Sequence, residues 1–232
     1  MHTLNLSDQV VAITGGFGSL GMAVAKAASN AGAMVALIDR EAAPASDLAP
    51  ALLFGGVDLS SEQSAQTTFN DIAHRCGRLN ALVNVAGTFR WEKIEGSDVK
   101  TWDLLYNVNL RTALNASRAA LPHLLRQSTS RIVNIGAGAA AKAALGMGAY
   151  AASKSGVARL TEAMAEEFKD RGLTVNAVLP SIIDTPPNRA DMPNADFSRW
   201  VKAEEIASLI VFLLSGLAGA INGASVPIVG RV

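Results

Sequence analysis

The chain has 232 residues; half of them are hydrophobic, and 20 basic and 20 acidic residues leave no net charge. Such a chain can bury a large core, and it lacks the basic surplus that would predict binding to nucleic acid or to an anionic membrane. A single cysteine, Cys76, excludes an internal disulfide. Because the N-terminus also lacks the basic and apolar regions of a secretion signal, we expect a cytoplasmic protein.

The first half of the chain alternates short hydrophobic runs with helix-compatible segments. Val10–Thr14 predicts a buried strand that ends in a glycine turn, and a helix over residues 19–31 follows it. Three further hydrophobic runs predict strands at residues 33–38, 52–58 and 79–85. A helix from about Ser60 to Cys76 lies between the last two.

The second half continues the alternation. Residues 101–127 read as one long helix, in which Pro122 predicts a kink or a break. The polar segment 181–200 is long for a loop without secondary structure, and such loops are usually functional or disordered. The most apolar stretch, 206–221, has 16 residues. Because a bilayer needs roughly 20, we interpret it as part of a buried helix. The other expected elements are strands at 131–135, 173–179 and 224–229 and helices at about 148–171 and 204–215.

Strands that alternate with helices from end to end are typical of βαβ units. The sequence therefore predicts an α/β fold with a doubly wound, mostly parallel seven-stranded sheet and helices on both faces. No repeat or change in composition marks a boundary, so we expect residues 1–232 to form a single domain.

Glycines follow the first strand in the pattern Gly16-x-Gly18-x-x-Gly21. Glycines permit a tight turn and let a pyrophosphate approach the backbone, while the following helix offers free N–H groups and a positive dipole end. The pattern alone also fits an ordinary glycine-rich turn. Its position between a strand and a helix favours a dinucleotide site.

Two carboxylates follow the next strands. Asp39 closes the second strand, where it can accept hydrogen bonds from the adenosine ribose and would repel a 2′-phosphate, which favours NAD(H). Arg40 can neutralise a phosphate, so NADP(H) stays an alternative, and Asp39 could also be a solvated turn residue. Asp58 either accepts from the adenine amino group or caps the next helix.

Tyr150 and Lys154 are spaced to share one face of a helix. A phenol with a pKa near 10 is a poor acid–base catalyst at neutral pH, but a nearby cation favours the phenolate and lowers that pKa. The pair therefore predicts proton transfer.

With these features in place, the chain resembles the short-chain dehydrogenase/reductase family over nearly its whole length. The resemblance implies a Rossmann fold, a dinucleotide-binding catalytic domain, hydride transfer to or from nicotinamide, and a homodimer or homotetramer packed through the helices at 101–127 and around Tyr150. The motifs that carry it are the glycine turn, Asp39, Asp58-Leu59, Asn84-Val85-Ala86-Gly87, Asn109, Tyr150-x-x-x-Lys154, and Asn176–Pro180 with Thr185.

The resemblance also implies the roles of individual residues. Tyr150 would donate the proton, Lys154 would hold the ribose and lower the tyrosine pKa, and Asn109 would support a water relay. No metal is expected. The implied cofactor residues are Gly15, Phe17, Gly18, Ser19 (in place of the usual middle glycine), Leu20, Gly21, Asp39, Arg40, Asp58, Leu59, Asn84, Ala86, Gly87, Pro180, Ile183 and Thr185.

One departure from the family concerns the chemistry. Ala137 stands where the family has its catalytic serine, and residues 136–149 contain no other hydroxyl. That serine normally donates a hydrogen bond to the substrate carbonyl, and loss of such a donor usually costs a large factor in rate. Either the protein is inactive, or Thr88 or Ser181 supplies the donor, or the substrate does not need it.

A closer resemblance, to the dihydropteridine reductase branch of the family, favours the third explanation. It covers residues 141–150 and 183–200, and that branch also has alanine at the serine position. We therefore expect an enzyme that uses NADH to reduce a quinonoid dihydropterin or a similar flat, polar small molecule. The alternatives are a carbonyl or alcohol dehydrogenase that tolerates Ala137, and a non-catalytic NAD(H)-binding regulator.

Four residues are candidates for the substrate side. Phe89 and Trp91 follow the fourth strand, where they either stack on a ligand or pack on the protein itself. Met192 could cover a flat ligand, and Ala137 would lie beside the reacting group. The intact set of Asn109, Tyr150 and Lys154 argues against the regulator.

Overall fold

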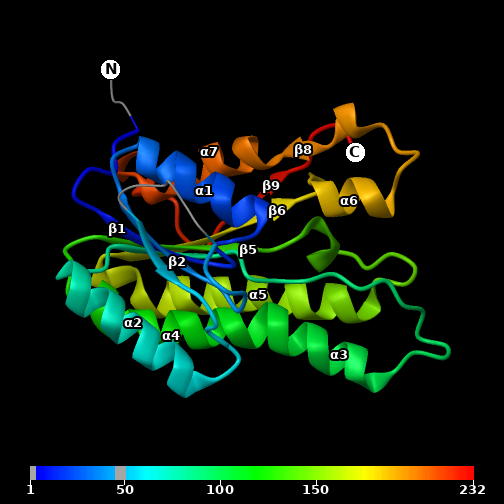
Figure 1. Cartoon of the computed structure of the whole chain (residues 1–232), viewed down its shortest axis with the longest axis horizontal. Helices are drawn as coiled ribbons and strands as arrows, with labels where there is room; N and C mark the ends of the chain where they lie inside the picture. Colours follow the sequence, from blue (N-terminus) through cyan, green and yellow to red (C-terminus); the bar gives the residue numbers. More distant parts are fainter. Residues whose placement is uncertain (1–3, 45–50) are drawn as a thin grey trace.

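Seven parallel strands form the middle layer of the protein, as the computed structural model of residues 4–44 and 51–232 shows (Figure 1). Their order in the sheet is β3-β2-β1-β4-β5-β6-β9, and each of the six pairings is parallel. The strands are β1 (Val10–Thr14), β2 (Met34–Ile38), β3 (Ala51–Phe54), β4 (Ala81–Asn84), β5 (Ser130–Ile135), β6 (Leu173–Pro180) and β9 (Ser225–Ile228).

Helices cover both faces of this sheet (Figure 1). On one face α1 (Ser19–Asn30) packs against α7 (Ala203–Leu214). On the other face lie α2 (Glu62–Cys76), α4 (Thr112–Leu124) and α5 (Gly148–Phe168). The expected doubly wound α/β fold is confirmed.

The central strands β1, β4 and β5 are buried on both sides, so their residues alternate between two cores. In β1, Val11 and Ile13 belong to the core under α1 and α7, whereas Val10 and Ala12 belong to the core under the other three helices. Successive side chains of a strand point to opposite faces. The result is the continuous apolar run that is typical of parallel sheets.

The expected long helix over residues 101–127 is three consecutive segments, α3 (Val99–Leu105), the π-helix η1 (Tyr106–Arg111) and α4. Pro122 does not end it, because α4 continues two residues further, to Leu124. The irregularity lies at η1 instead, and π-helical turns often occur at functional sites.

The polar segment 181–200 is not a structureless loop. It contains β7 (Ile183–Asp184), α6 (Pro186–Asp191) and η4 (Phe197–Arg199), and β7 pairs in parallel with β8 (Val201–Lys202). Thr185 caps α6 through its side chain, and two prolines occupy the first helical positions. This local pattern is a strong helix start. Three short 3₁₀ turns complete the described chain: η2 (Gly138–Ala140), η3 (Lys169–Arg171) and η5 (Gly216–Ala218).

Element ends otherwise differ from the sequence prediction by a few residues. The largest difference is β3, which ends at Phe54 because Gly56 turns the chain with a φ of 72°. Among residues 4–44 and 51–232, no helix combines the length and the hydropathy needed to cross a membrane.

Candidate functional site

A cleft of about 770 Å³ lies along the carboxyl ends of the central strands. The turns that leave these strands form much of its wall, with Gly15 after β1, Asp39 after β2 and Gly136 after β5. In doubly wound sheets, ligands bind where the strand order reverses, which here is between β1 and β4. The cleft therefore lies where this fold binds ligands.

The glycine turn between β1 and α1 is fixed by steric contacts. Gly15 has a φ of 62°, and a Cβ atom on it would lie 2.8 Å from the backbone nitrogen of Ala86. A Cβ atom on Gly21 would overlap the carbonyl oxygen of Gly15. Both positions therefore require glycine for the turn to keep its shape.

The start of α1 fits an anionic group. Gly18 is the N-cap and supplies no side-chain hydrogen bond, and the first turn carries no acidic residue. The first N–H groups of a helix have no acceptor within it. Those of Ser19 and Leu20 can therefore bind a negative charge, and the pyrophosphate of a dinucleotide fits this cradle.

Asp39 ties the glycine turn to the second strand. Its carboxylate accepts hydrogen bonds from the backbone N–H of Phe17 at 3.0 Å and of Glu41 at 3.2 Å. A carboxylate has about four acceptor sites, so it can also accept from a ribose hydroxyl in the cleft. The neighbouring Arg40 lines the cleft as well and pairs with Glu41 at 3.9 Å.

Asp58 lines the same end of the cleft and holds its own turn. It accepts hydrogen bonds from the backbone N–H and the hydroxyl of Ser60 at 2.8 and 2.7 Å. These two bonds hold the pKa of Asp58 below its ordinary value. The Asn115 side chain of α4 donates to the carbonyls of Leu59 and Ser60 and so fixes this turn from outside.

Tyr150 and Lys154 both line the cleft from α5. Lys154 is only 5 % exposed, and its Nζ donates a hydrogen bond of 2.7 Å to the carbonyl oxygen of Ile135 at the end of β5. An ammonium group has three donors. Two of them remain for a ligand.

Asn109 lies in η1 and is 1 % exposed. Its Oδ1 accepts from the Thr88 N–H at 2.7 Å, while its Nδ2 donates to the Thr88 carbonyl at 3.0 Å and to the Ser153 hydroxyl at 2.9 Å. Ser153 in turn donates to the Tyr150 carbonyl at 2.8 Å. The side chain therefore holds the loop after β4 and the helix of Tyr150 together.

Gly87 has no side chain, and this lets Asn109 and Lys154 lie close to the loop after β4. A Cβ atom there would lie 3.1 Å from Asn109 Oδ1 and 3.3 Å from Lys154 Nζ. The backbone after β4 thus passes directly against two of the three expected catalytic side chains.

Aromatic residues stand on the other side of Tyr150. The Phe89 ring meets the Tyr150 ring edge-on, with 4.9 Å between centroids and 85° between planes. Phe89 is 46 % exposed and also lines the cleft. Trp91 instead lies against Gly146, where any side chain would overlap its indole.

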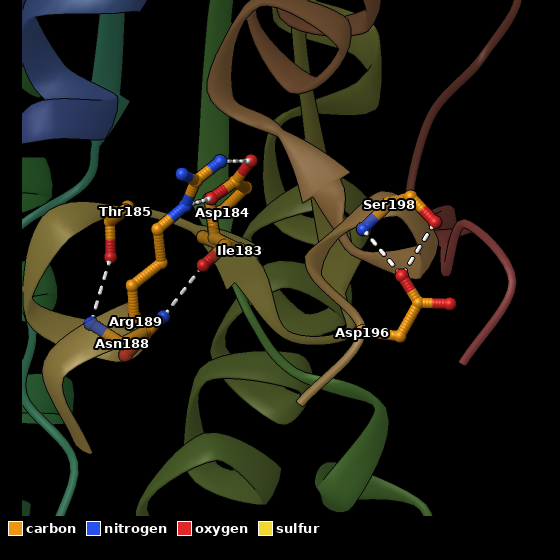
Figure 2. A network of polar contacts seen from close by, with 7 residues as sticks. All are labelled: Ile183, Asp184, Thr185, Asn188, Arg189, Asp196 and Ser198. Carbon is orange, nitrogen blue, oxygen red and sulfur yellow. Dashed lines mark hydrogen bonds and ion pairs between the residues drawn. The ribbon is translucent and has the colours of Figure 1, made fainter. Parts of the chain in front are cut away.

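Polar contacts fold the segment after β6 into a fixed unit (Figure 2). Arg189 forms a two-pronged ion pair with Asp184, with distances of 2.6 and 2.8 Å. Its guanidinium lies 4.8 Å from the ring centroid of Phe197. Asn188 donates through Nδ2 to the Ile183 carbonyl at 2.7 Å. Ile183 and Asn188 line the cleft, so this unit forms one of its walls.

Comparison with known proteins assigns the chain to a family. The model of the family described as short chain dehydrogenase matches residues 9–196. The chain belongs to the short-chain dehydrogenase/reductase family. It is therefore an NAD(P)-dependent oxidoreductase, in agreement with the glycine turn and the Tyr150/Lys154 pair.

Individual relatives of this dehydrogenase cover nearly the whole chain. It is 32 % identical to 2-(S)-hydroxypropyl-CoM dehydrogenase 3 of Xanthobacter autotrophicus, over 97 % of this chain and 96 % of that protein. It is also 32 % identical to a 3-oxoacyl-(acyl-carrier-protein) reductase of Pseudomonas aeruginosa, over 98 % of each. The structure of a short chain dehydrogenase from Burkholderia cenocepacia in complex with NADP matches with a TM-score of 0.86 and 30 % identity, over 97 % of this chain and 98 % of that one. None of these relatives is named a dihydropteridine reductase.

Burial controls the ionisation of the two central groups of this dehydrogenase. It raises the pKa of Tyr150 to about 12 and lowers the pKa of Lys154 to about 8. Both shifts follow from the cost of holding a charge away from water. The shift of the tyrosine pKa is thus opposite to the lowering expected from Lys154, because it comes from the removal of the phenol from water.

Several expected site residues do not line the cleft. Asn84 is buried and donates through Nδ2 to Asn134 Oδ1 at 2.8 Å and to the Ser117 hydroxyl at 3.1 Å, so it joins strands and helix. The Thr185 side chain caps α6. The others outside the cleft wall are Phe17, Ser19, Trp91, Asn109, Ala137 and Met192.

The cleft also contains residues that the sequence analysis did not name. One group comes from α3, η1 and α4 and shows a helical spacing of three or four residues, which a search for a second helix face could have found. A second group lies in the loops after β4 and β5. The first group is Leu104, Asn107, Val108 and Thr112, and the second is Arg90 and Gly136.

We predict that Gly21→Ala weakens NADH binding at least tenfold, because the new methyl group overlaps the Gly15 carbonyl and displaces the turn. Titration of NADH fluorescence with each protein measures this. Gly216→Ala is the matched control, since a Cβ atom at Gly216 meets nothing within 4 Å. Equal affinity of the Gly21→Ala variant and the wild type would contradict the prediction.

Proposed function

We propose that this protein catalyses the reversible transfer of hydride between NAD(H) and a small molecule that carries a secondary hydroxyl or a keto group. The observation that carries the proposal is that Tyr150 and Lys154 share one cleft with the glycine turn and Asp39. The names of two relatives support it, since one is a hydroxypropyl-CoM dehydrogenase and the other a 3-oxoacyl reductase.

Each side chain has a separate task in this reaction. In the reducing direction, the Tyr150 hydroxyl donates its proton to the carbonyl oxygen. A nicotinamide cofactor held by the glycine turn, Asp39 and Lys154 would supply the hydride to the carbonyl carbon, so that the carbonyl would become an alcohol as the cofactor is oxidised. Lys154 holds the nicotinamide ribose and stabilises the phenolate left on Tyr150. Asn109 holds α5 and the loop after β4 in fixed positions relative to each other.

A quinonoid dihydropterin is the second candidate substrate. Ala137 and the resemblance of residues 183–200 to dihydropteridine reductase favour it. A bicyclic ring offers several polar atoms and a broad surface for orientation, so it depends less on one donor at the carbonyl. The relatives that match over the full chain favour the first candidate. A non-catalytic NAD(H)-binding regulator would have no need for Tyr150 and Lys154 in the cleft.

The test is to follow NADH loss with wild-type protein and a panel of ketones, and separately with quinonoid dihydropterin. We expect turnover of at least one ketone and its loss by about 10³-fold or more in Tyr150→Phe, which removes the proton donor. NADH binding by that variant should be unchanged. Turnover of the pterin alone would replace the first candidate with the second. Binding of NADH without turnover of either would favour the regulator.

Asp39 should determine the preference between the two cofactors. We predict that Asp39→Asn raises the ratio of kcat/KM with NADPH to kcat/KM with NADH at least tenfold, because it removes the charge that repels a 2′-phosphate. An asparagine retains an acceptor for the Phe17 N–H. Asp58→Asn is the control, and it should change the ratio much less. An equal change in both variants would show that Asp39 has no special part in cofactor choice.

The reduction rate should depend on pH through Lys154. Its pKa of about 8 means that it is charged below that pH and neutral above it, whereas Tyr150, with a pKa of about 12, keeps its proton throughout. We therefore predict that kcat/KM for ketone reduction is flat below about pH 8 and falls above it. In Lys154→Arg the guanidinium stays charged, so any residual activity should fall only at higher pH. A wild-type profile that is flat to pH 10 would contradict this role.

A further inference from the structure

A second hydroxyl donor is missing at the position where the family has its serine. Ala137 is 5 % exposed and has an extended backbone, so it contributes only a methyl group. The carbonyl oxygen of a small substrate would then have Tyr150 as its one hydroxyl partner. Any second hydroxyl that serves this oxygen must lie at the same end of the cleft.

Five hydroxyl side chains line the cleft, and three of them donate to acceptors of the protein itself. Ser60 donates to Asp58 Oδ1 at 2.7 Å and Thr112 to the Val108 carbonyl at 2.7 Å. Ser181 donates to the Val229 carbonyl at 2.8 Å, so it is not free to serve a substrate. The two whose hydroxyls have no hydrogen-bond partner in the described part of the chain are Tyr150 and Thr88.

Two hydrogen bonds hold the backbone of Thr88 in place. Its N–H and its carbonyl are both bonded to the Asn109 side chain, at 2.7 and 3.0 Å. Of its polar groups only the hydroxyl remains without a partner. A rigid donor is the kind that stabilises developing charge, because it needs no reorganisation during the reaction.

The neighbours of Thr88 contact the catalytic groups on both sides. Gly87 lies against Lys154 Nζ, and the Phe89 ring meets the Tyr150 ring. Thr88 and Ala137 also follow adjacent strands, β4 and β5. Asn84 of β4 is paired with Asn134 of β5; Thr88 lies four residues after Asn84, and Ala137 lies three residues after Asn134.

We propose that the Thr88 hydroxyl donates a hydrogen bond to the substrate carbonyl oxygen, in place of the serine that Ala137 replaces. The inference rests on the proposed function, because it assigns a role in carbonyl reduction. Thr88 donates a hydrogen bond and transfers no proton, so the proton still comes from Tyr150. The substrate oxygen then has two donors, one on α5 and one on the loop after β4.

The experiment compares Thr88→Val and Thr88→Ser with the wild type on a ketone that the wild type reduces. Thr88→Val keeps the shape of the side chain and removes the hydroxyl, and we expect kcat to fall about 10²–10³-fold, as for loss of one donor to an oxyanion. Thr88→Ser should stay within about tenfold of the wild type. NADH affinity and thermal stability should be unchanged in both variants.

A double variant separates this role from a structural one. If positions 88 and 137 serve the same oxygen, Ala137→Ser should restore activity at least tenfold in the Thr88→Val background, and have a much smaller effect in the wild type. Undiminished reduction by Thr88→Val, a parallel loss of NADH binding, or no restoration by Ala137→Ser would each overturn the inference. If the wild type reduces no ketone, the proposed function itself fails, before any variant is compared.

Discussion

Asn109 forms three hydrogen bonds and has almost no exposed surface, and through it three segments distant in sequence meet at one side chain. A buried amide must satisfy its polar atoms inside the protein, or it costs about 1–3 kcal/mol. The loop after β4 supplies two partners and α5 the third. The positions of Gly87, Thr88 and Tyr150 in the cleft therefore depend on this one residue.

Tyr150 and Lys154 are shielded from water, and this shielding shifts their pKa values. Lys154 is held almost fully buried by its bond to the Ile135 carbonyl, and burial shifts its pKa down while it shifts that of Tyr150 up. Low exposure strengthens each remaining interaction with a ligand, because less solvent competes for it. The same burial makes the ammonium of Lys154 lose its proton more easily, so its charge changes at moderately alkaline pH.

In the proposed reaction the walls of the cleft orient the substrate, because Ala137 offers no hydroxyl. Phe89 stands edge-on to Tyr150, Thr88 keeps an unused hydroxyl, and the unit from Ile183 to Trp200 forms a wall held by the Asp184–Arg189 pair. The Arg189 side chain of that pair is about half exposed, and ion pairs open to solvent contribute little to stability. Its geometry matters more, since it fixes how Ile183 and Asn188 face the cleft.

The fold could be predicted closely because its causes are local. Apolar runs, helix starts and glycines are properties of neighbouring residues, and they located all seven strands of the sheet and the turn at Gly15–Gly21. Where the prediction failed, distant contacts decided. The π-helical turn at η1 has no proline to announce it, and Asn109 in it bonds to Thr88, 21 residues earlier in the chain. The segment 181–200 has order because β7 near its start pairs with β8, which directly follows the segment.

By itself, the sequence determined the family, the parallel sheet and the identity of the glycine, Asp39 and Tyr150/Lys154 positions. These follow from spacing along one strand, one turn or one helix. Only the tertiary structure decided that Asn84 is enclosed between strands, that Ser181 is already bonded and that the Thr88 hydroxyl is not. It also decided that the pKa of Tyr150 is raised and that of Lys154 is lowered. Burial and hydrogen-bond partners are set by segments tens of residues apart, such as the bond from the Ala86 N–H to the Thr14 hydroxyl, and no local pattern records which of them will meet.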